Sequence, residues 1–505
     1  MTKKYIEKIL TARVYDVAVE TPLDKAKNLS KRINNNVLMK REDLQPVFSF
    51  KLRGAYNKID QLLQKGELEG VIAASAGNHA QGLALAAQQR GVKATIVMPK
   101  TTPAIKVRAV KAYGAKAVLV GDTYDEAYDF AIAEAESKNL VFVHPYDDPD
   151  VIAGQGTVAM EILRQYPDPV DAVFIPVGGG GLCAGMAAFI KYLRPETKVI
   201  AVEAEESACL AAAMDKKRRI ILPQVGIFAD GVAVKQIGKE TYRIIKDNID
   251  DVITVNTDEM CAAIKDIFDD TRSIMEPAGA LGIAGMKKYV EQHGVENKTL
   301  IAVNSGANMN FDRLRHVAER SELGENREAL LAVTIPEKPG SFHKFCKILG
   351  KRGITEFNYR YSSADAAHVY AGIQLSEGAA EKETVIDLLK DKGYPVIDMT
   401  DNEVAKLHIR YMVGGRVQGL ENEVVYRFQF PERPGALLQF LTNIGKRWNI
   451  SMFHYRNHGA GYGRVLVGIQ VPSKERKLIK EYLDKVGYPF WDETDNPAYE
   501  LFLNA

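Results

Sequence analysis

The chain has 505 residues, of which 46% are hydrophobic and 26% are charged, as is usual for a soluble globular protein. Its 66 lysines and arginines balance 65 aspartates and glutamates, so the net charge of +1 excludes a general attraction to nucleic acid or to an anionic membrane. The length predicts three or four domains, and no apolar run approaches the roughly 20 residues that span a bilayer.

Cysteine usage and the first residues bear on the cellular compartment. The four cysteines are scattered, with no pair at the spacing of metal ligands: Cys183, Cys209, Cys261 and Cys346. They indicate reduced thiols and neither a disulfide framework nor a zinc site. The lysines near Met1 are not followed by the apolar core of a signal peptide. We therefore expect a cytoplasmic protein.

The first segment with chemical interest runs from Ser49 to Ala55 and contains Lys51. Apolar residues recur at helical spacing after Lys51, and Ser49 is placed to cap such a helix. Lys51 would then lie in the first turn, where the helix dipole disfavours an ammonium group. A lysine that sheds its proton is a candidate Schiff-base former. Taken alone, the segment fits an exposed lysine on an amphipathic helix better.

From residue 71 onward, short apolar runs alternate with helical patterns. Strands are expected at 71–74, 95–98, 117–120, 140–143, 172–175, 199–202 and 300–303. Helices are expected between them at 79–89, 103–113, 125–138 and 182–193. Near-continuous apolar strands separated by helices are typical of a parallel sheet covered on both faces. Residues 1–320 are therefore expected to form two α/β sheets or one large one.

Two loops at the carboxyl ends of expected strands are candidate ligand sites, because ligands of open α/β sheets bind at that edge. The loop Ser75-Ala76-Gly77-Asn78-His79 offers amides and a hydroxyl to a carboxylate, although a helix cap at Ser75 or Asn78 explains it equally well. The run Gly178 to Gly181 lets backbone amides surround an anion. It lacks the motifs of nucleoside triphosphate and dinucleotide loops, which favours a single phosphate.

Two further loops carry polar groups. Ser305 lies in Asn304-Ser305-Gly306-Ala307-Asn308, after another expected strand. Glu276 precedes Pro277 at an expected helix start, where the helix dipole explains a carboxylate without any chemistry. Neither loop identifies a site by itself.

The last third of the chain is an internal repeat. Pro336-Glu337-Lys338-Pro339-Gly340 recurs as Pro431-Glu432-Arg433-Pro434-Gly435, and Asn358-Tyr359-Arg360 matches His454-Tyr455-Arg456. Three further blocks follow in the same order. Each copy predicts strand, Pro-Gly turn, helix, two strands, helix and strand, which is a βαββαβ module.

Together, the Lys51 segment, the asparagine loop, the tetraglycine run, Glu-Pro-Ala-Gly-Ala and the Ser305 loop resemble the tryptophan-synthase-β-like pyridoxal phosphate enzymes, and among these the threonine deaminases. The resemblance covers residues 5–320 and implies a fold type II catalytic core. The repeated tail resembles the ACT-like regulatory region of the biosynthetic, isoleucine-sensitive members. The expected domains are a catalytic domain at 1–320, a linker at 321–328, and ACT-like modules at 329–405 and 423–505.

The resemblance implies a role for each motif residue. Lys51 would carry pyridoxal 5′-phosphate as a Schiff base and move the α-proton of the substrate. Ser75 and Asn78 would receive the substrate carboxylate, and Tyr359 and Tyr455 would line effector pockets, although both tyrosines fit ordinary strand positions equally well. The other cofactor contacts would be the ring of Phe50, the side chain of Asn78, the hydroxyl of Ser305 and the amides of Gly178, Gly179, Gly180, Gly181 and Leu182.

The implied activity is conversion of L-threonine to 2-oxobutanoate and ammonia. A neutral Ser305 facing the pyridine nitrogen favours β-hydroxyl loss over racemisation. Isoleucine would inhibit, valine would oppose it, and the chain would form a homotetramer. The resemblance includes racemases that bind a divalent cation through acidic residues after a Val-Glu pair. The sequence after Glu203 lacks their downstream aspartate, so no metal is expected. The alternatives are a serine-preferring dehydratase of the same fold and a catalytically silent amino-acid sensor.

Overall fold

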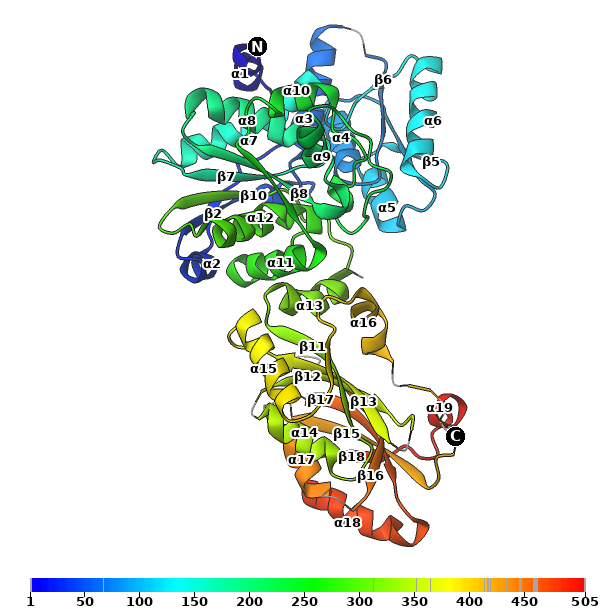
Figure 1. Ribbon diagram of the computed structural model, residues 1–505. Coiled ribbons are helices and arrows are strands. Elements are labelled where there is room, and N and C mark those ends of the chain that lie inside the picture. The colour runs from blue at the N-terminus through cyan, green and yellow to red at the C-terminus, as the bar shows by residue number, and fades with distance from the viewer. Residues whose placement is uncertain are drawn as a thin grey trace. The chain divides into compact units, whose positions relative to one another are not determined.

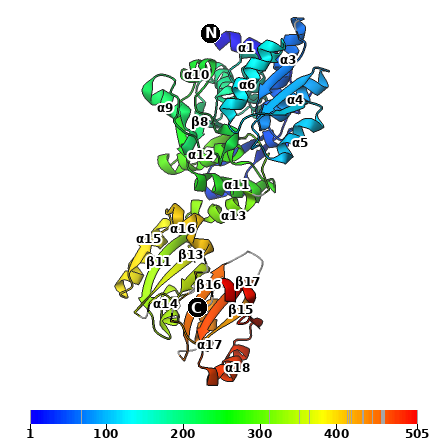
Figure 2. The same cartoon turned by 90° about the vertical axis from the view of Figure 1, so that its right-hand side faces the viewer.

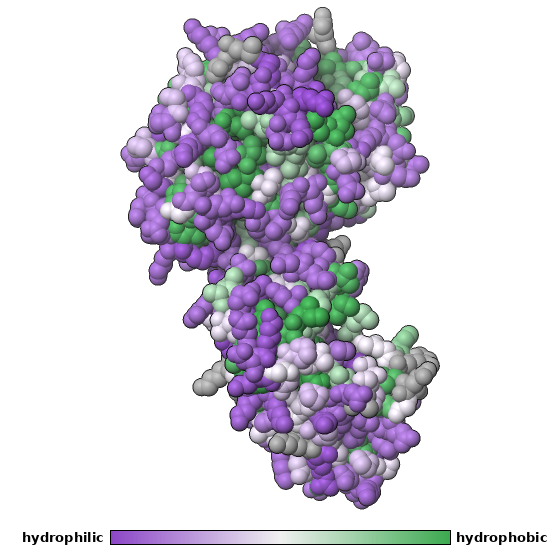
Figure 3. All heavy atoms as spheres, in the orientation of Figure 1, coloured by the Kyte–Doolittle hydropathy of each residue, from purple (hydrophilic) through white to green (hydrophobic). Residues whose placement is uncertain are grey.

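A computed structural model describes residues 2–66, 68–311, 313–350, 352–363, 365–412, 414–415, 417, 419–431, 435–444, 447–456 and 462–503. Contacts divide the chain into two compact units, residues 1–321 and residues 322–505 (Figures 1 and 2). Among the described residues, no helix combines the length and the apolar character needed to cross a membrane. The face shown in Figure 3 is mainly hydrophilic, as the charge content leads one to expect.

The first unit contains a six-stranded sheet in which β2, β10, β7, β8 and β9 are parallel and β1 is antiparallel at the edge. The strands, in sheet order, are β1 (Leu23–Lys25), β2 (Asn36–Arg41), β10 (Thr299–Asn304), β7 (Ala172–Pro176), β8 (Lys198–Ala204) and β9 (Asp251–Val255). Alternate β7 residues point to opposite faces: Val173 packs with α8 (Gly181–Leu193), whereas Phe174 packs with α12 (Pro277–His293). Both faces are therefore buried, with α1 (Thr2–Leu10) and α7 (Pro149–Gln165) beside α8, and α11 (Thr257–Thr271) beside α12 (Figure 1).

A second, four-stranded sheet in this unit is wholly parallel. Its strands, in order, are β5 (Lys116–Leu119), β4 (Ala94–Met98), β3 (Val71–Ala74) and β6 (Val141–Phe142). One face packs on α3 (Lys51–Gln64), α4 (Asn78–Gln89) and α5 (Ala104–Ala112), and the other on α6 (Tyr124–Ser137). The predicted α/β alternation is confirmed, with element ends shifted by one or two residues. The pattern did not reveal β1, β2, β9 or α7.

Glycines bring α3 into direct backbone contact with two other helices. A methyl group on Gly82 of α4 would lie 2.9 Å from the amide nitrogen of Leu52, and one on Gly154 of α7 would lie 2.6 Å from the Cα of Gly54. Side chains larger than hydrogen would force the helices apart. The first turn of α3, which carries Lys51, is thus enclosed by α4 and α7.

The second unit is one eight-stranded antiparallel sheet with the order β14-β11-β13-β12-β16-β17-β15-β18. Helices pack on one face and share a single core with both halves of the sheet. The first half consists of β11 (Glu328–Pro336), α14 (Ser341–Leu349), β12 (Ile354–Arg360), β13 (Ala366–Gln374), α15 (Ala379–Asp391) and β14 (Val396–Asp398). The second half consists of β15 (Glu423–Pro431), α17 (Ala436–Ile444), β16 (Asn449–Arg456), β17 (Tyr462–Gln470), α18 (Arg476–Val486) and β18 (Phe490–Asp492).

This order confirms the repeated βαββαβ modules. The modules meet where β12 pairs with β16, and Asn358 lies opposite His454, its counterpart in the repeat. The two modules are therefore related by an approximate twofold axis through this pair. Two short helices follow the modules, α16 (Glu403–Leu407) and α19 (Pro497–Phe502). Upstream of the modules, α13 (Arg313–Gly324) runs across the boundary between the two units.

Candidate active site

Lys51 is the first residue of α3, but the predicted cap at Ser49 is wrong. The cap residue is Phe50, which makes no side-chain capping bond. Ser49 instead forms a β-bridge with Gly306, and within the described residues its buried hydroxyl has no hydrogen-bond partner. The Phe50 amide donates to the carbonyl of Ser305 at 3.3 Å. These backbone contacts fasten the lysine segment to the loop that carries Ser305.

The amine of Lys51 lies near a backbone carbonyl and an aromatic ring. Its Nζ donates to the carbonyl of Pro145 at 3.3 Å and lies 5.2 Å from the centre of the Phe50 ring. Burial lowers the pKa of Lys51 to about 8, and the nearby Glu276 carboxylate partly opposes this shift. At pH 7 roughly a tenth of the amine is therefore unprotonated, far more than for an ordinary lysine, and able to act as a nucleophile or a base.

The tetraglycine run connects β7 to α8 and is closely packed on both sides. A methyl group on Gly179 would lie 2.2 Å from ring carbons of Tyr146, and one on Gly178 would lie 2.8 Å from the Cα of Val232. Gly180 has φ 92°, a conformation that strongly favours glycine, and α8 begins at the next residue without a side-chain cap. The first amides of a helix have no partner within it, so this turn is a cradle for an anion.

Asn78 links three loops. It is the first residue of α4, and the cap is Gly77, so the alternative in which Ser75 or Asn78 caps the helix is wrong. Its Nδ2 donates to Oε1 of Glu276 at 2.6 Å, and its Oδ1 accepts from Nδ2 of Asn308 at 2.7 Å. The Ser75 hydroxyl accepts from the amide of Gly77 at 3.3 Å.

Glu276 is a site residue that the sequence did not identify. Its carboxyl is buried at the start of α12, contacts Asn78, and makes no capping bond with its own helix. Burial, reinforced by Asp230, raises the pKa of Glu276 to about 7. The Glu-Pro pair suggested a helix start, which is correct, but no local pattern indicates contact with a residue almost two hundred positions away.

Two neutral groups complete the surroundings of Lys51. The buried hydroxyl of Ser305 donates to the carbonyl of Ala278 at 3.3 Å. The Nε2 of His79 lies 3.0 Å from the carbonyl oxygen of Val143, and its buried Nδ1 has no partner within the described residues. Burial lowers the pKa of His79 to about 3, with Lys51 adding to the shift, so this ring stays neutral.

The Glu203 carboxylate is buried against the start of a helix. Its two carboxylate oxygens accept from the amides of Leu210 and Ala211, each at 2.8 Å, at the start of α9 (Cys209–Lys216). A helix terminus thus occupies both oxygens. Across the part of the chain that the structure describes, no cluster of three acidic, histidine or cysteine side chains is arranged to hold a metal.

In the second unit, Tyr359 takes part in a polar cluster between the modules. Its hydroxyl donates to the carboxylate of Glu337, and Asn449 of the other module donates to the same carboxylate at 2.7 Å. Burial and Glu337 raise the pKa of Tyr359. Tyr455 lies on the neighbouring strand, opposite Phe357. The family resemblance indicated the two tyrosines, which the repeat makes equivalent, whereas the contact of Asn449 with Glu337 joins residues of different modules and was not predicted.

Comparison with known proteins agrees with this geometry. Residues 14–306 match the family model "Pyridoxal-phosphate dependent enzyme", and residues 319–409 and 414–503 match "C-terminal regulatory domain of Threonine dehydratase". The biosynthetic L-threonine dehydratase of Burkholderia multivorans is 55% identical over 99% of both chains, and that of Escherichia coli is 53% identical over 99% of this chain and 97% of the relative.

A solved structure is similar over part of the chain. The processed form of threonine deaminase isoform 2 from Solanum lycopersicum is 48% identical, with a TM-score of 0.62, over 63% of this chain and 93% of that one. The chain therefore belongs to the biosynthetic threonine dehydratases, a family of pyridoxal-phosphate-dependent enzymes with C-terminal regulatory domains.

Proposed function

We propose that this protein dehydrates and deaminates L-threonine to 2-oxobutanoate and ammonia, with pyridoxal 5′-phosphate bound to Lys51. One observation carries the proposal: a half-buried lysine, whose amine has a lowered pKa, lies on a helix whose start is fastened to the Ser305 loop. The named relatives favour threonine over serine as the substrate. Relative kcat/KM values on threonine and serine test this preference. They must be measured, because one methyl group changes the free energy of discrimination between substrates by only about 1–3 kcal/mol.

The residues present fit the cofactor. The tetraglycine turn leads directly into α8 without a side-chain cap, so the amides at the start of that helix suit the phosphate. Phe50 would pack on the ring, Asn78 would meet the ring hydroxyl, and Ser305 would face the ring nitrogen. The remaining phosphate donors would be the amides of Gly178, Gly179, Gly180, Gly181 and Leu182. When bound, the cofactor supplies an electron sink for the carbon that loses its proton.

The protein groups would then divide the work of the reaction. The unprotonated amine of Lys51 would take the α-proton as a general base. Ser75, Asn78 and neighbouring amides at the start of α4 would hold the substrate carboxylate. Ser305 carries no charge, so it would not stabilise a protonated ring nitrogen, which favours departure of the β-hydroxyl over proton return and racemisation.

Replacing the lysine tests the first part of this proposal. Lys51→Ala is expected to abolish the visible absorbance of the purified protein and to lower threonine turnover by about 100-fold to 10,000-fold, the usual contribution of a positioned base. Lys65→Ala, at the exposed end of the same helix, is the matched control and should retain both properties. A wild-type protein that stays colourless after addition of pyridoxal phosphate would refute the assignment.

The lowered pKa of Lys51 predicts how cofactor attachment depends on pH. Only the unprotonated amine attacks a carbonyl, so the attachment rate should rise with pH and level off above about pH 8. An ordinary lysine, with a pKa near 10.4, would show a rise that continues beyond pH 9. The rate is measured by visible absorbance after mixing apoprotein with cofactor, with Nα-acetyl-lysine as the reference amine for titration of the cofactor itself.

We further propose that isoleucine binds the ACT-like modules and inhibits the enzyme, that valine opposes it, and that Tyr359 and Tyr455 line the two effector sites. The match to a threonine dehydratase regulatory domain supports this proposal. So does the position of Tyr359, whose hydroxyl belongs to a polar cluster built from both modules. Coupling between the sites must be reciprocal, so threonine would weaken isoleucine binding by the same factor.

Removal of the second unit tests the regulatory proposal. Residues 1–321 are expected to retain threonine turnover and to lose inhibition by isoleucine, as measured by dose–response assays. In the full chain, Tyr359→Phe removes the bond to Glu337 and should raise the half-inhibitory isoleucine concentration about fivefold or more, as loss of a hydrogen bond to a charged group implies. Undiminished inhibition of the shortened chain would contradict the assignment.

We also propose a homotetramer in the cytoplasm. Light scattering should give the mass of four chains, and a monomer at micromolar concentration would contradict this assembly. The four cysteines are all free and buried, which supports a reducing compartment.

A further inference from the structure

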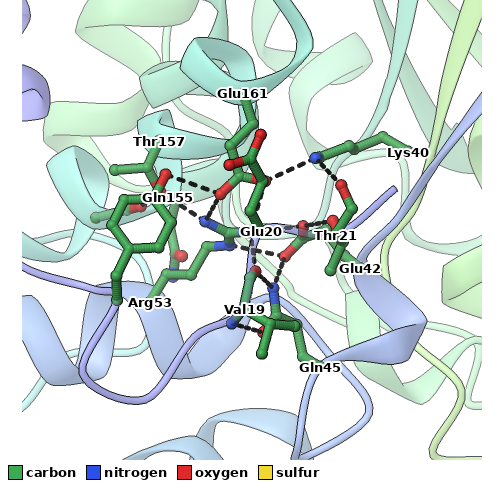
Figure 4. Close-up of polar contacts among 12 residues, drawn as sticks. Val19, Glu20, Thr21, Lys40, Glu42, Gln45, Arg53, Gln155, Thr157 and Glu161 are labelled. Atoms are coloured by element: carbon green, nitrogen blue, oxygen red, sulfur yellow. Dashed lines mark hydrogen bonds and ion pairs between the residues drawn. The ribbon is translucent and has the colours of Figure 1, made fainter. Parts of the chain in front are cut away.

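A cluster of four charged side chains lies next to the start of α3 and is completely buried. Lys40, Glu42, Arg53 and Glu161 have side-chain exposures of 0% (Figure 4). They come from β2, from the turn after it, from α3 and from α7. Two positive and two negative groups leave the cluster electrically neutral. Arg53 is the member nearest in sequence to Lys51.

Arg53 occupies the centre of the cluster. Its Nε and Nη2 each donate to Glu42 at 2.8 Å, while Nη1 and Nη2 donate to Glu161 at 2.6 and 3.0 Å. Nη1 also donates to the hydroxyl of Thr157 at 3.1 Å, and Nη2 to the carbonyl of Val19 at 3.3 Å. The guanidinium therefore binds a carboxylate along two of its edges, a geometry that lysine cannot reproduce.

Lys40 holds the far side of the cluster. Its Nζ lies 2.6 Å from Oε2 of Glu161 and donates to the carbonyl of Thr21 at 2.6 Å and to Gln165 at 3.0 Å. The Thr21 hydroxyl donates to Glu42 at 2.6 Å. Each carboxylate that contacts Arg53 is thus fixed by a further partner, and the whole cluster is rigidly cross-linked.

The first turn of α3 needs this external support because its local signals oppose a helix start. It has no side-chain cap and no acidic residue, and it carries two basic side chains, Lys51 and Arg53, at the positive end of the helix dipole. The contact from outside comes through α7: Gly154 packs against Gly54, and the side chain of Gln155 accepts from the Gly54 amide at 3.2 Å.

Stability alone does not account for the cluster. Buried ion pairs lose about as much free energy by desolvation as they gain by attraction, and apolar replacements are often neutral or stabilising. The two cross-linked carboxylates hold the guanidinium of Arg53 in a fixed position. They thereby also fix the backbone of Arg53, two residues from Lys51. An error of about 1 Å in a catalytic group costs up to about 100-fold in rate.

We propose that Arg53 is a positioning residue: its clamp between Glu42 and Glu161 fixes the first turn of α3 and so aims the Lys51 amine. This inference rests on the role proposed for Lys51. It predicts that loss of the clamp slows chemistry and cofactor attachment while substrate affinity is largely kept.

The test variant is Arg53→Lys, which keeps the positive charge but removes the guanidinium that binds a carboxylate along two edges. We expect kcat to fall about tenfold or more with KM within twofold, and the attachment rate at saturating pyridoxal phosphate to fall in parallel. Arg164→Lys is the matched control, since this α7 arginine pairs with Glu20 at the surface with 56% of its side chain exposed. It should leave kcat and attachment unchanged.

Thermal unfolding of the same samples separates positioning from a purely structural role. If the midpoint falls while the folded protein keeps wild-type kcat and attachment rate, the proposal is overturned. Should Arg53→Lys fail to fold, Thr157→Val decides, because it removes the neutral bond to Nη1 together with the bond from the same hydroxyl to the Gly154 carbonyl of its own helix. A loss of about threefold in both rates supports the proposal, and unchanged rates overturn it. Failure of the Lys51 assignment is distinguishable, because the wild type would then show no attachment at all.

Discussion

The site depends on backbone contacts that admit no side chain. Gly82 and Gly154 let α4 and α7 touch the first turn of α3, and the bridge from Ser49 to Gly306 joins that turn to the loop after β10. Packed backbones shift less than surface side chains, since interiors are close-packed and resist small displacements. The lysine, the asparagine loop and Ser305 consequently share one rigid frame, although their sequence positions span most of the first unit.

Features with a local signature could be predicted from the sequence. Apolar runs predicted all four strands of the smaller sheet but only β7, β8 and β10 of the larger one, and the duplicated Pro-Gly motifs predicted the paired modules. The anion cradle expected at the glycine run stays a prediction. Contacts made over long sequence separations could not be predicted. The prediction that Ser49 caps the helix was wrong because Ser49 pairs with Gly306, which lies far away in the sequence. Glu276 was missed because only the folded chain brings it to Asn78. Arg53 looked like an ordinary helix residue because its partners lie on other elements.

The two modules are similar but not equivalent. Asn449, which donates to Glu337 and Gln470, begins β16; the matching residue ahead of β12 is Gly353, and a methyl group there would lie 2.5 Å from Oε1 of Gln374. Tyr359 thus shares its carboxylate partner with an amide side chain, whereas a glycine stands at the matching position of the other module. Sites that differ in this way have a physical reason to discriminate between effectors of similar size.

The pairing of β12 with β16 also has a consequence for concentration dependence. When two modules on separate chains must associate to form a shared site, dilution separates them and the site is lost, because their association is bimolecular. Here the partners are tethered in one polypeptide, so each meets the other at an effective concentration near the millimolar range whatever the protein level. Dilution therefore does not separate Glu337 from Asn449, and a cell that makes few copies of the protein keeps the same regulatory surface as one that makes many.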